Sequence, residues 1–224
     1  MTPAAAIVAR LRALRNERNI AGMRRFGITS SREQLGISVA TLREIARPFR
    51  RDHALAIELW ATGILEAMIL ATVIEDPAQV TRGQMERWVR GCDNWALTDA
   101  CAFLFDRTAF AEDKARAWSA RRPEFVKRCG YALMAGLAIH RKELPDEAFL
   151  RLLPLIHRGA GDERNFVKKA VNWALRQIGK RNPRLRRAAS AEARRIARLA
   201  TPAARWIARD ALRELKKKPG KSRA

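Results

Sequence analysis

Residues 164–183, RNFVKKAVNWALRQIGKRNP, carry the pattern that decides the fold class. Apolar residues recur there at the three- and four-residue spacing that places side chains on one face of an α-helix. The members of this stripe are Val167, Ala170, Val171, Ala174 and Leu175. Pro183 stands where the first turn of a following helix would begin. The stretch therefore predicts an amphipathic helix that buries one face, followed at once by another helix.

The rest of the chain shows the same helical pattern, and alternating strand-like runs are absent. Capping residues mark several boundaries: Ser38, Asp93 or Asn94, Asp162 after the break at Gly159, and Thr201 before Pro202. The expected helices span residues 3–19, 38–50, 53–61, 64–75, 81–92, 94–106, 109–119, 123–140, 145–157, 163–180, 184–199 and 202–217. An all-α fold follows.

A weak internal repeat indicates how these short helices are arranged. Trp95 and Trp173 lie 78 residues apart, which is twice a unit of 39 residues. HEAT-like repeats have a period of roughly 40 residues. The segments EFVKRCGYAL and NFVKKAVNWAL also begin alike and place Arg128 and Lys169 in similar local frames. We expect one α-solenoid domain of HEAT-like repeats over residues 1–215, with a concave cationic surface, and a basic disordered tail over 216–224.

The charge balance points to a polyanionic partner. The 224 residues carry 45 Lys and Arg against 23 Asp and Glu, a net charge of +22. Residues 1–51 hold a net +8, residues 52–175 are neutral, and residues 176–224 hold +14. Such an excess repels itself in the folded state and favours binding to a phosphate backbone. The composition disfavours an ordinary metabolic enzyme, although solvated basic helices at the two ends would give the same count.

Other classes of site find little support in the sequence. Cys92, Cys101 and Cys129 form no CxxC pair, and the three histidines lack the spacing of a metal site. We therefore expect no disulfide, metal or other cofactor. No apolar run approaches the ~18–20 residues that cross a bilayer, and the N-terminus does not resemble a signal peptide. These features predict a cytoplasmic protein that does not bind membranes.

Two tryptophans are candidates for chemistry. In the segment CDNWALTDA, Asp99 follows Trp95 by four residues, so the indole and the carboxylate share a helix face. Asp is unfavourable inside a helix, yet on the spacing alone a solvated or ion-paired Asp99 and a core Trp95 are the better explanation. Trp173 lies at the edge of its apolar stripe, near Lys169 and Arg176, where it could contact nucleotides or pack between repeats. We assign Trp60, Trp88, Trp118 and Trp206 to packing.

The segments CDNWALTDA, EFVKRCGYALM and RNFVKKAVNWALRQIGKRNP together resemble the AlkD-type DNA alkylation repair family of HEAT-like-repeat glycosylases. The resemblance spans roughly residues 20–215. It implies that Asp99 is the catalytic carboxylate and that Trp95 and Trp173 complete the catalytic site. It also implies that Arg128 holds the DNA backbone near the lesion. Residues expected to line the same DNA-binding groove are Phe166, Lys168, Lys169 and Arg176.

The resemblance implies a monofunctional glycosylase that acts on double-stranded DNA containing alkylated bases, as a monomer. A purine alkylated at N3 or N7 is cationic, so its glycosidic bond is already weakened. A carboxylate can stabilise the oxocarbenium character of the deoxyribose and position a water, while indoles attract a cationic sugar or base. The family works from the backbone side without a base-binding pocket.

Two alternatives remain open at this point. The chain could be a non-catalytic binder of damaged or unusually structured DNA on the same scaffold. It could also be a protein scaffold, as many HEAT arrays are, although the charge of +22 argues against that.

Overall fold

The computed structural model describes residues 2–216, and within them all regular structure is helical. The chain divides into two compact units, residues 1–108 and 109–224. The first unit contains α1 (Pro3–Ala13), α2 (Glu17–Arg25), α3 (Val39–Ala46), the 3-10 turn η1 (Arg47–Phe49), α4 (His53–Ala61), α5 (Leu65–Ile74), α6 (Arg82–Arg90) and α7 (Trp95–Phe105). The second contains α8 (Ala111–Ser119), α9 (Glu124–His140), α10 (Asp146–Leu150), α11 (Leu153–Gly159), α12 (Asn165–Lys180), α13 (Pro183–Ile196) and α14 (Pro202–Lys216).

The first unit is built around α5, which packs against α3, α4 and α7. All of its residues except Val73 are buried. Glu66 on this helix is 1% exposed, and its carboxylate accepts hydrogen bonds from the backbone N–H groups of Leu35 and Gly36 at 2.9 and 2.7 Å. A buried carboxylate needs such donors, so Glu66 fixes the long connection between α2 and α3. In the same unit the indoles of Trp60 and Trp88 stack with their ring centroids 4.1 Å apart, as the sequence predicted for packing tryptophans.

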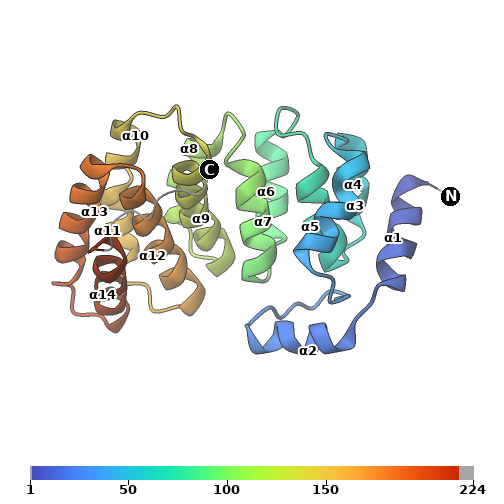
Figure 1. The fold of residues 1–224 in the computed structure, drawn as a ribbon, viewed down its shortest axis with the longest axis horizontal. Helices are drawn as coiled ribbons and strands as arrows, with labels where there is room; N and C mark the ends of the chain where they lie inside the picture. Colours follow the sequence, from blue (N-terminus) through green and yellow to red (C-terminus); the bar gives the residue numbers. More distant parts are fainter. Residues whose placement is uncertain (1, 217–224) are drawn as a thin grey trace. The chain divides into compact units, whose positions relative to one another are not determined.

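The second unit has two layers of helices. One layer contains α9, α12 and α14, with α9 and α12 side by side (Figure 1). The other contains α8, α11 and α13, which pack on the first layer. Gly130 allows α9 to approach α8 closely, because a Cβ at this position would lie 2.4 Å from the backbone nitrogen of Ser119. The close contact between α8 and α9 therefore depends on the absence of a side chain at Gly130.

Most of the predicted helices are confirmed with small shifts at their ends. The hydroxyls of Ser38 and Thr201 and the side chain of Asn94 each cap the helix that follows. Three details were wrong. The helix expected over 3–19 breaks at Leu14–Asn16, where Asn16 caps a second helix. The single helix expected over 145–157 is divided into two helices, α10 and α11. Asp162 does not cap α12, whose N-cap is Arg164.

Each break has a physical cause. The Asn16 side chain accepts a hydrogen bond from the backbone N–H of Asn19, which begins α2 afresh. Pro154 lies in the first turn of α11, where its missing N–H is tolerated but where it cannot continue α10. The sequence predicts a single domain over residues 1–215, and the structure groups the helices into two compact units. The single domain stays a prediction. In the basic tail expected from Lys216, Lys216 itself ends α14, and 217–224 lie outside the described residues.

Candidate functional site

Hydrogen bonds and an ion pair hold the beginning of α7 in place. Asn94 is fully buried, caps the helix by accepting from the backbone N–H of Leu97 at 3.0 Å, and accepts the Thr98 hydroxyl at its own carbonyl at 2.7 Å. Asp93 accepts hydrogen bonds from the Ser30 hydroxyl and from Arg32, both at 2.6 Å. The first turn of α7 is thereby tied to the connection that follows α2.

Trp95 and Asp99 lie on the half-exposed face of α7. Both belong to a stripe at four-residue spacing that continues to Phe103, whereas Leu97, Cys101 and Leu104 face the core. The Trp95 indole Nε1 donates a hydrogen bond to the Phe26 carbonyl oxygen at 3.0 Å. The structure therefore brings the two predicted residues to one accessible face, with the indole orientation fixed by a backbone acceptor.

The second group of predicted residues lies on α9 and α12. Arg128 is buried at 6% exposure, and its Nη1 donates to the Phe166 carbonyl oxygen at 2.7 Å. The ring of Phe166 lies 5.8 Å from that of Phe125. These contacts join the first turn of α12 to the first turns of α9, so Arg128 and Phe166 lie in contact, while their role at a DNA-binding groove stays a prediction.

The other predicted residues on α12 differ in their exposure to solvent. Lys169 is exposed, and Trp173 one turn later is half-buried on the same face. Lys168 is half-buried, with its Nζ 5.4 Å from the ring centroid of Trp206 on α14. Among the predicted DNA-binding cations, Lys169 is therefore the most accessible.

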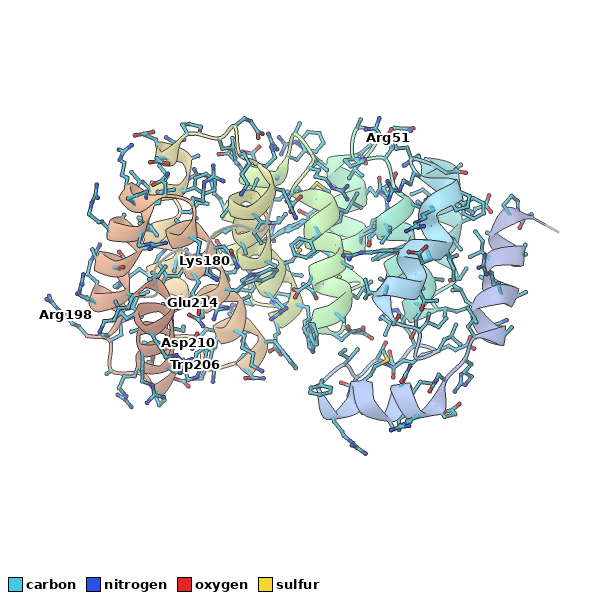
Figure 2. The ribbon with its side chains drawn as sticks, viewed as in Figure 1. Arg51, Lys180, Arg198, Trp206, Asp210 and Glu214 are labelled. Carbon is cyan, nitrogen blue, oxygen red and sulfur yellow. The ribbon has the colours of Figure 1, made fainter. Side chains whose placement is uncertain are left out.

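Arg176 is engaged with an acidic residue of α14. Its Nη1 lies 3.1 Å from the Asp210 carboxylate, which also accepts a hydrogen bond from Asn172 at 2.7 Å. Burial opposes the ionisation of Asp210, but the Asn172 hydrogen bond and the charges of Arg176 and Arg213 outweigh it and hold the Asp210 pKa below its usual range. Trp206, Asp210 and Glu214 follow one another along α14 (Figure 2).

A model of the DNA alkylation repair enzyme family matches residues 7–215 of the chain. The chain belongs to this family. An uncharacterized protein of Listeria innocua, Lin0241, is 27% identical over 146 residues, which are 63% of this chain and 64% of the relative. The match thus spans less than two thirds of that relative.

A solved structure resembles this DNA alkylation repair family member over almost its full length. It represents a new family of proteins related to the HEAT-like repeat DNA glycosylases, with affinity for branched DNA structures. The TM-score is 0.78, the sequence identity is 21%, and the match covers 95% of each chain. The all-α fold of HEAT-like repeats predicted from the sequence is confirmed.

The predicted site residues of this DNA alkylation repair protein are divided between the units. Trp95 and Asp99 belong to the first unit, and the other six belong to the second. Sequence reasoning missed two residues that hold or flank the first pair: Asp93 as an anchor rather than a cap, and Phe26 as the acceptor for Trp95. No sequence signal identifies Phe26 as this acceptor, because the acceptor is its main-chain carbonyl and does not depend on the side chain.

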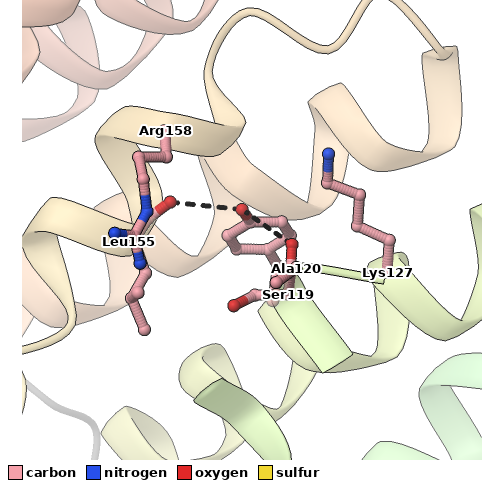
Figure 3. A pocket seen from close by; sticks show the side chains of 6 residues that line it. Ser119, Ala120, Lys127, Leu155 and Arg158 are labelled. Atoms are coloured by element: carbon pink, nitrogen blue, oxygen red, sulfur yellow. Dashed lines mark hydrogen bonds between the residues drawn. The ribbon is translucent and has the colours of Figure 1, made fainter. Parts of the chain in front are cut away.

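A small pocket in the second unit lies apart from the predicted residues of α12. It has a volume of about 160 Å³ and is lined by Ser119, Ala120, Lys127, Tyr131, Leu155 and Arg158 (Figure 3). The Tyr131 hydroxyl lies 3.2 Å from the Leu155 carbonyl oxygen, and burial raises the Tyr131 pKa. Lys127 is paired with Asp162 at 2.8 Å. These contacts explain the pocket as part of the packing between α8, α9 and α11.

Neither a metal site nor a membrane span emerges from the described part of the chain. Residues 2–216 contain no cluster of three or more metal-binding side chains. None of the helices in this range is both long and apolar enough to cross a membrane.

Proposed function

We propose that this protein is a monofunctional DNA glycosylase that hydrolyses the N-glycosidic bond of cationic N3- or N7-alkylated purines in duplex DNA. The observation that carries the proposal is the pairing of Trp95 and Asp99 on one half-exposed face of α7 in a member of the DNA alkylation repair enzyme family. A carboxylate on a half-exposed helix face can be reached from solvent, which a core residue cannot.

The chemistry follows from the charge of the lesion. As the bond to a cationic base breaks, positive charge builds on the deoxyribose. The Asp99 carboxylate stabilises that charge and takes a proton from the attacking water, whose oxygen forms the new bond to the sugar. The base leaves with the electrons of the glycosidic bond, and an abasic site remains.

Electron-rich indoles suit this reaction. Trp95 and Trp173 attract the cationic sugar or base through cation–π and CH–π contacts. The half-buried positions of both residues support this role, because neither side chain is sealed in the core. A site of this kind depends on the positive charge of the lesion rather than on hydrogen bonds to its edge.

The DNA backbone is held by the cationic residues of α9 and α12 in this proposal. Lys169 supplies the most accessible charge. Arg128 contacts the phosphates near the lesion and, through its bond to the Phe166 carbonyl, also fixes the beginning of α12. Phe166, Lys168 and Arg176 lie on α12 together with Lys169. Double-stranded DNA is the partner, and the protein acts as a monomer in the cytoplasm, associated with the nucleoid.

The test is release of methylated purines from methylated duplex DNA at low salt by the native protein and by Asp99→Asn. The proposal requires release by the native protein and a large loss in the variant while duplex affinity is retained. Absence of release by the native protein, measured while it binds the duplex, would contradict the proposal.

A second candidate function is binding of branched DNA without catalysis. The observation that favours it is the structural likeness to a protein with affinity for branched DNA structures. Four-way junctions and matched linear duplexes, compared at one salt concentration, distinguish the two functions. Tight junction binding that is unchanged in Asp99→Asn, together with no base release by the native protein, would establish this second function.

A further inference from the structure

Helix α2 makes few packing contacts. Ile20 is its one buried residue, and no other helix of residues 2–216 shares an extensive contact with it. In Figure 1, α2 stands apart from the stacked helices of its unit. A nine-residue helix is marginal in water by itself, so specific contacts at its ends must hold it in place.

Hydrogen bonds fix α2 at both ends. At its beginning, the backbone N–H of Asn16 donates to the Leu35 carbonyl at 2.8 Å and the Asn19 side chain donates to the Gly36 carbonyl at 2.9 Å. Gly36 has a φ of +72° and lies so close to Asn16 that a Cβ there would be 2.4 Å from the Asn16 oxygen. At its end, the Trp95 indole donates to the Phe26 carbonyl at 3.0 Å.

The side chain of Phe26 faces solvent in spite of this anchoring. It is 76% exposed, whereas the other exposed large hydrophobic residues reach 43% at Leu14, 47% at Val39 and 37% at Ile57. Arg24 and Arg25 precede it, both are exposed, and neither forms an ion pair with another residue of 2–216. A ring held in water beside two available cations is a surface suited to a polyanion that also offers apolar groups.

We propose that the end of α2 is a DNA-contacting element in which the Phe26 ring packs against a nucleotide next to the lesion while Arg24 and Arg25 bind phosphates. The inference rests on the proposed DNA function. The indole that holds the Phe26 backbone belongs to Trp95, and Asp99 follows one helical turn later. A nucleotide that reaches Asp99 therefore brings its neighbour to Phe26.

Duplex DNA fits this surface better than a protein partner does. Aromatic side chains stack on bases and pack on deoxyribose without regard to sequence, and arginines neutralise the phosphates on either side. A protein partner would need acidic residues and a larger apolar area than the single ring that α2 presents.

The test compares Phe26→Ala with Phe26→Trp and with the control Ile57→Ala, which truncates an exposed apolar residue elsewhere in the same unit. Because Trp95 donates to a main-chain oxygen, Phe26→Ala keeps that hydrogen bond and removes only the ring. Affinity is measured by anisotropy with a labelled duplex that contains one 7-methylguanine, and base release is measured on the same duplex. Far-UV circular dichroism and sedimentation accompany both.

We expect Phe26→Ala to bind the duplex about tenfold more weakly, Phe26→Trp to restore affinity, and Ile57→Ala to match the native protein. Arg24→Gln and Arg25→Gln should each lower the slope of log affinity against log salt concentration by about one, the change expected for the loss of one phosphate contact. Native duplex affinity in Phe26→Ala, or a change in oligomeric state with no change in DNA binding, would overturn the inference. If the native protein releases no base but Phe26→Ala still weakens binding, the glycosylase proposal fails and the inference stands.

Discussion

The two helices that carry the predicted site tryptophans, α7 and α12, resemble each other in sequence but differ in what they present. Trp95 lies in the first turn of α7 and is followed four residues later by Asp99. Trp173 lies in the middle of α12, and the residue four positions later is Gln177. Both helices thus place an indole and a polar side chain on one half-exposed face, but only α7 supplies a carboxylate.

The supports of the two helices differ as well. The first turn of α7 is capped by a buried Asn94, anchored through Asp93 and linked to α2 through Trp95. Helix α12 has no side-chain cap and is fixed by packing against α9 and by ion pairs with α14. In the proposed mechanism, α7 supplies the reacting group, and α12 supplies charge and an aromatic surface.

The largest expected effect concerns the carboxylate. Asp99→Asn should lower the rate of base release by about a hundredfold or more, because the amide cannot stabilise the developing positive charge. Gln177→Asn is the matched control at the corresponding position of α12, and it should change the rate by less than about threefold. Single-turnover release from a duplex with one 7-methylguanine measures both. Equal effects at the two positions would remove the distinction between α7 and α12.

The next effect concerns packing. Gly130→Ala should lower the free energy of unfolding by about 2–3 kcal/mol, because the new Cβ would press against the backbone of α8. Gly22→Ala on α2 meets no atom within 4 Å and should raise it by about 0.5–1 kcal/mol through helix propensity. Urea denaturation measures both, and stabilisation by Gly130→Ala would contradict the close α8–α9 contact.

A smaller effect separates the two indoles. Trp95→Phe should lower the rate of base release about tenfold, because it weakens the cation–π contact and removes the donor to the Phe26 carbonyl. Trp173→Phe alters only the ring and should lower the rate about threefold. The same release assay compares them, and a larger loss at Trp173 would place the reacting centre nearer α12.

The smallest expected effect concerns the contribution of Asp162, in the segment before α12, to the stability of the fold. Burial opposes the ionisation of Asp162, but hydrogen bonds from Arg164 and Lys127 outweigh it and hold the Asp162 pKa well below its usual range. A depressed pKa stabilises the fold above the unfolded-state value of about 4, and this contribution is lost as the pH falls toward the folded-state value. Asp162→Asn should therefore lower stability by about 1 kcal/mol at pH 7. Thermal unfolding should show the difference from the native protein shrink below pH ~4, and a difference independent of pH would contradict this role.

Local sequence patterns predicted the helices well where capping residues and periodicity agreed, as at Ser38, Asn94 and Thr201. They failed where a break depends on a distant contact. Asn16 looks like an ordinary residue in a polar helix until its backbone N–H is seen to donate to the carbonyl of Leu35. Asp162 looks like a cap, but its carboxylate accepts hydrogen bonds from the backbone N–H and side chain of Arg164 and from Lys127 on α9, and α12 begins only after Arg164.

The candidate site could be predicted in part for the same reason. The four-residue spacing of Trp95 and Asp99 predicts their shared helix face, but the exposure of that face did not follow from the sequence, because the same spacing fits a core Trp95. The exposure of Phe26 did not follow either, because the hydrophobicity of an aromatic residue predicts burial and only the hydrogen bond from Trp95 shows where its backbone is held. The pairing of Arg176 with Asp210 likewise depends on the packing of α14 against α12.

In the mechanism that we propose, a carboxylate on α7 acts on a nucleotide whose base carries a positive charge that weakens its bond to the sugar. The most direct measurement is single-turnover release by the native protein from two otherwise identical, fully bound duplexes, one with 7-methylguanine and one with uncharged hypoxanthine at the same position. We expect release of 7-methylguanine and no measurable release of hypoxanthine. Release of neither base from the bound duplexes, or equal release of both, would contradict this mechanism.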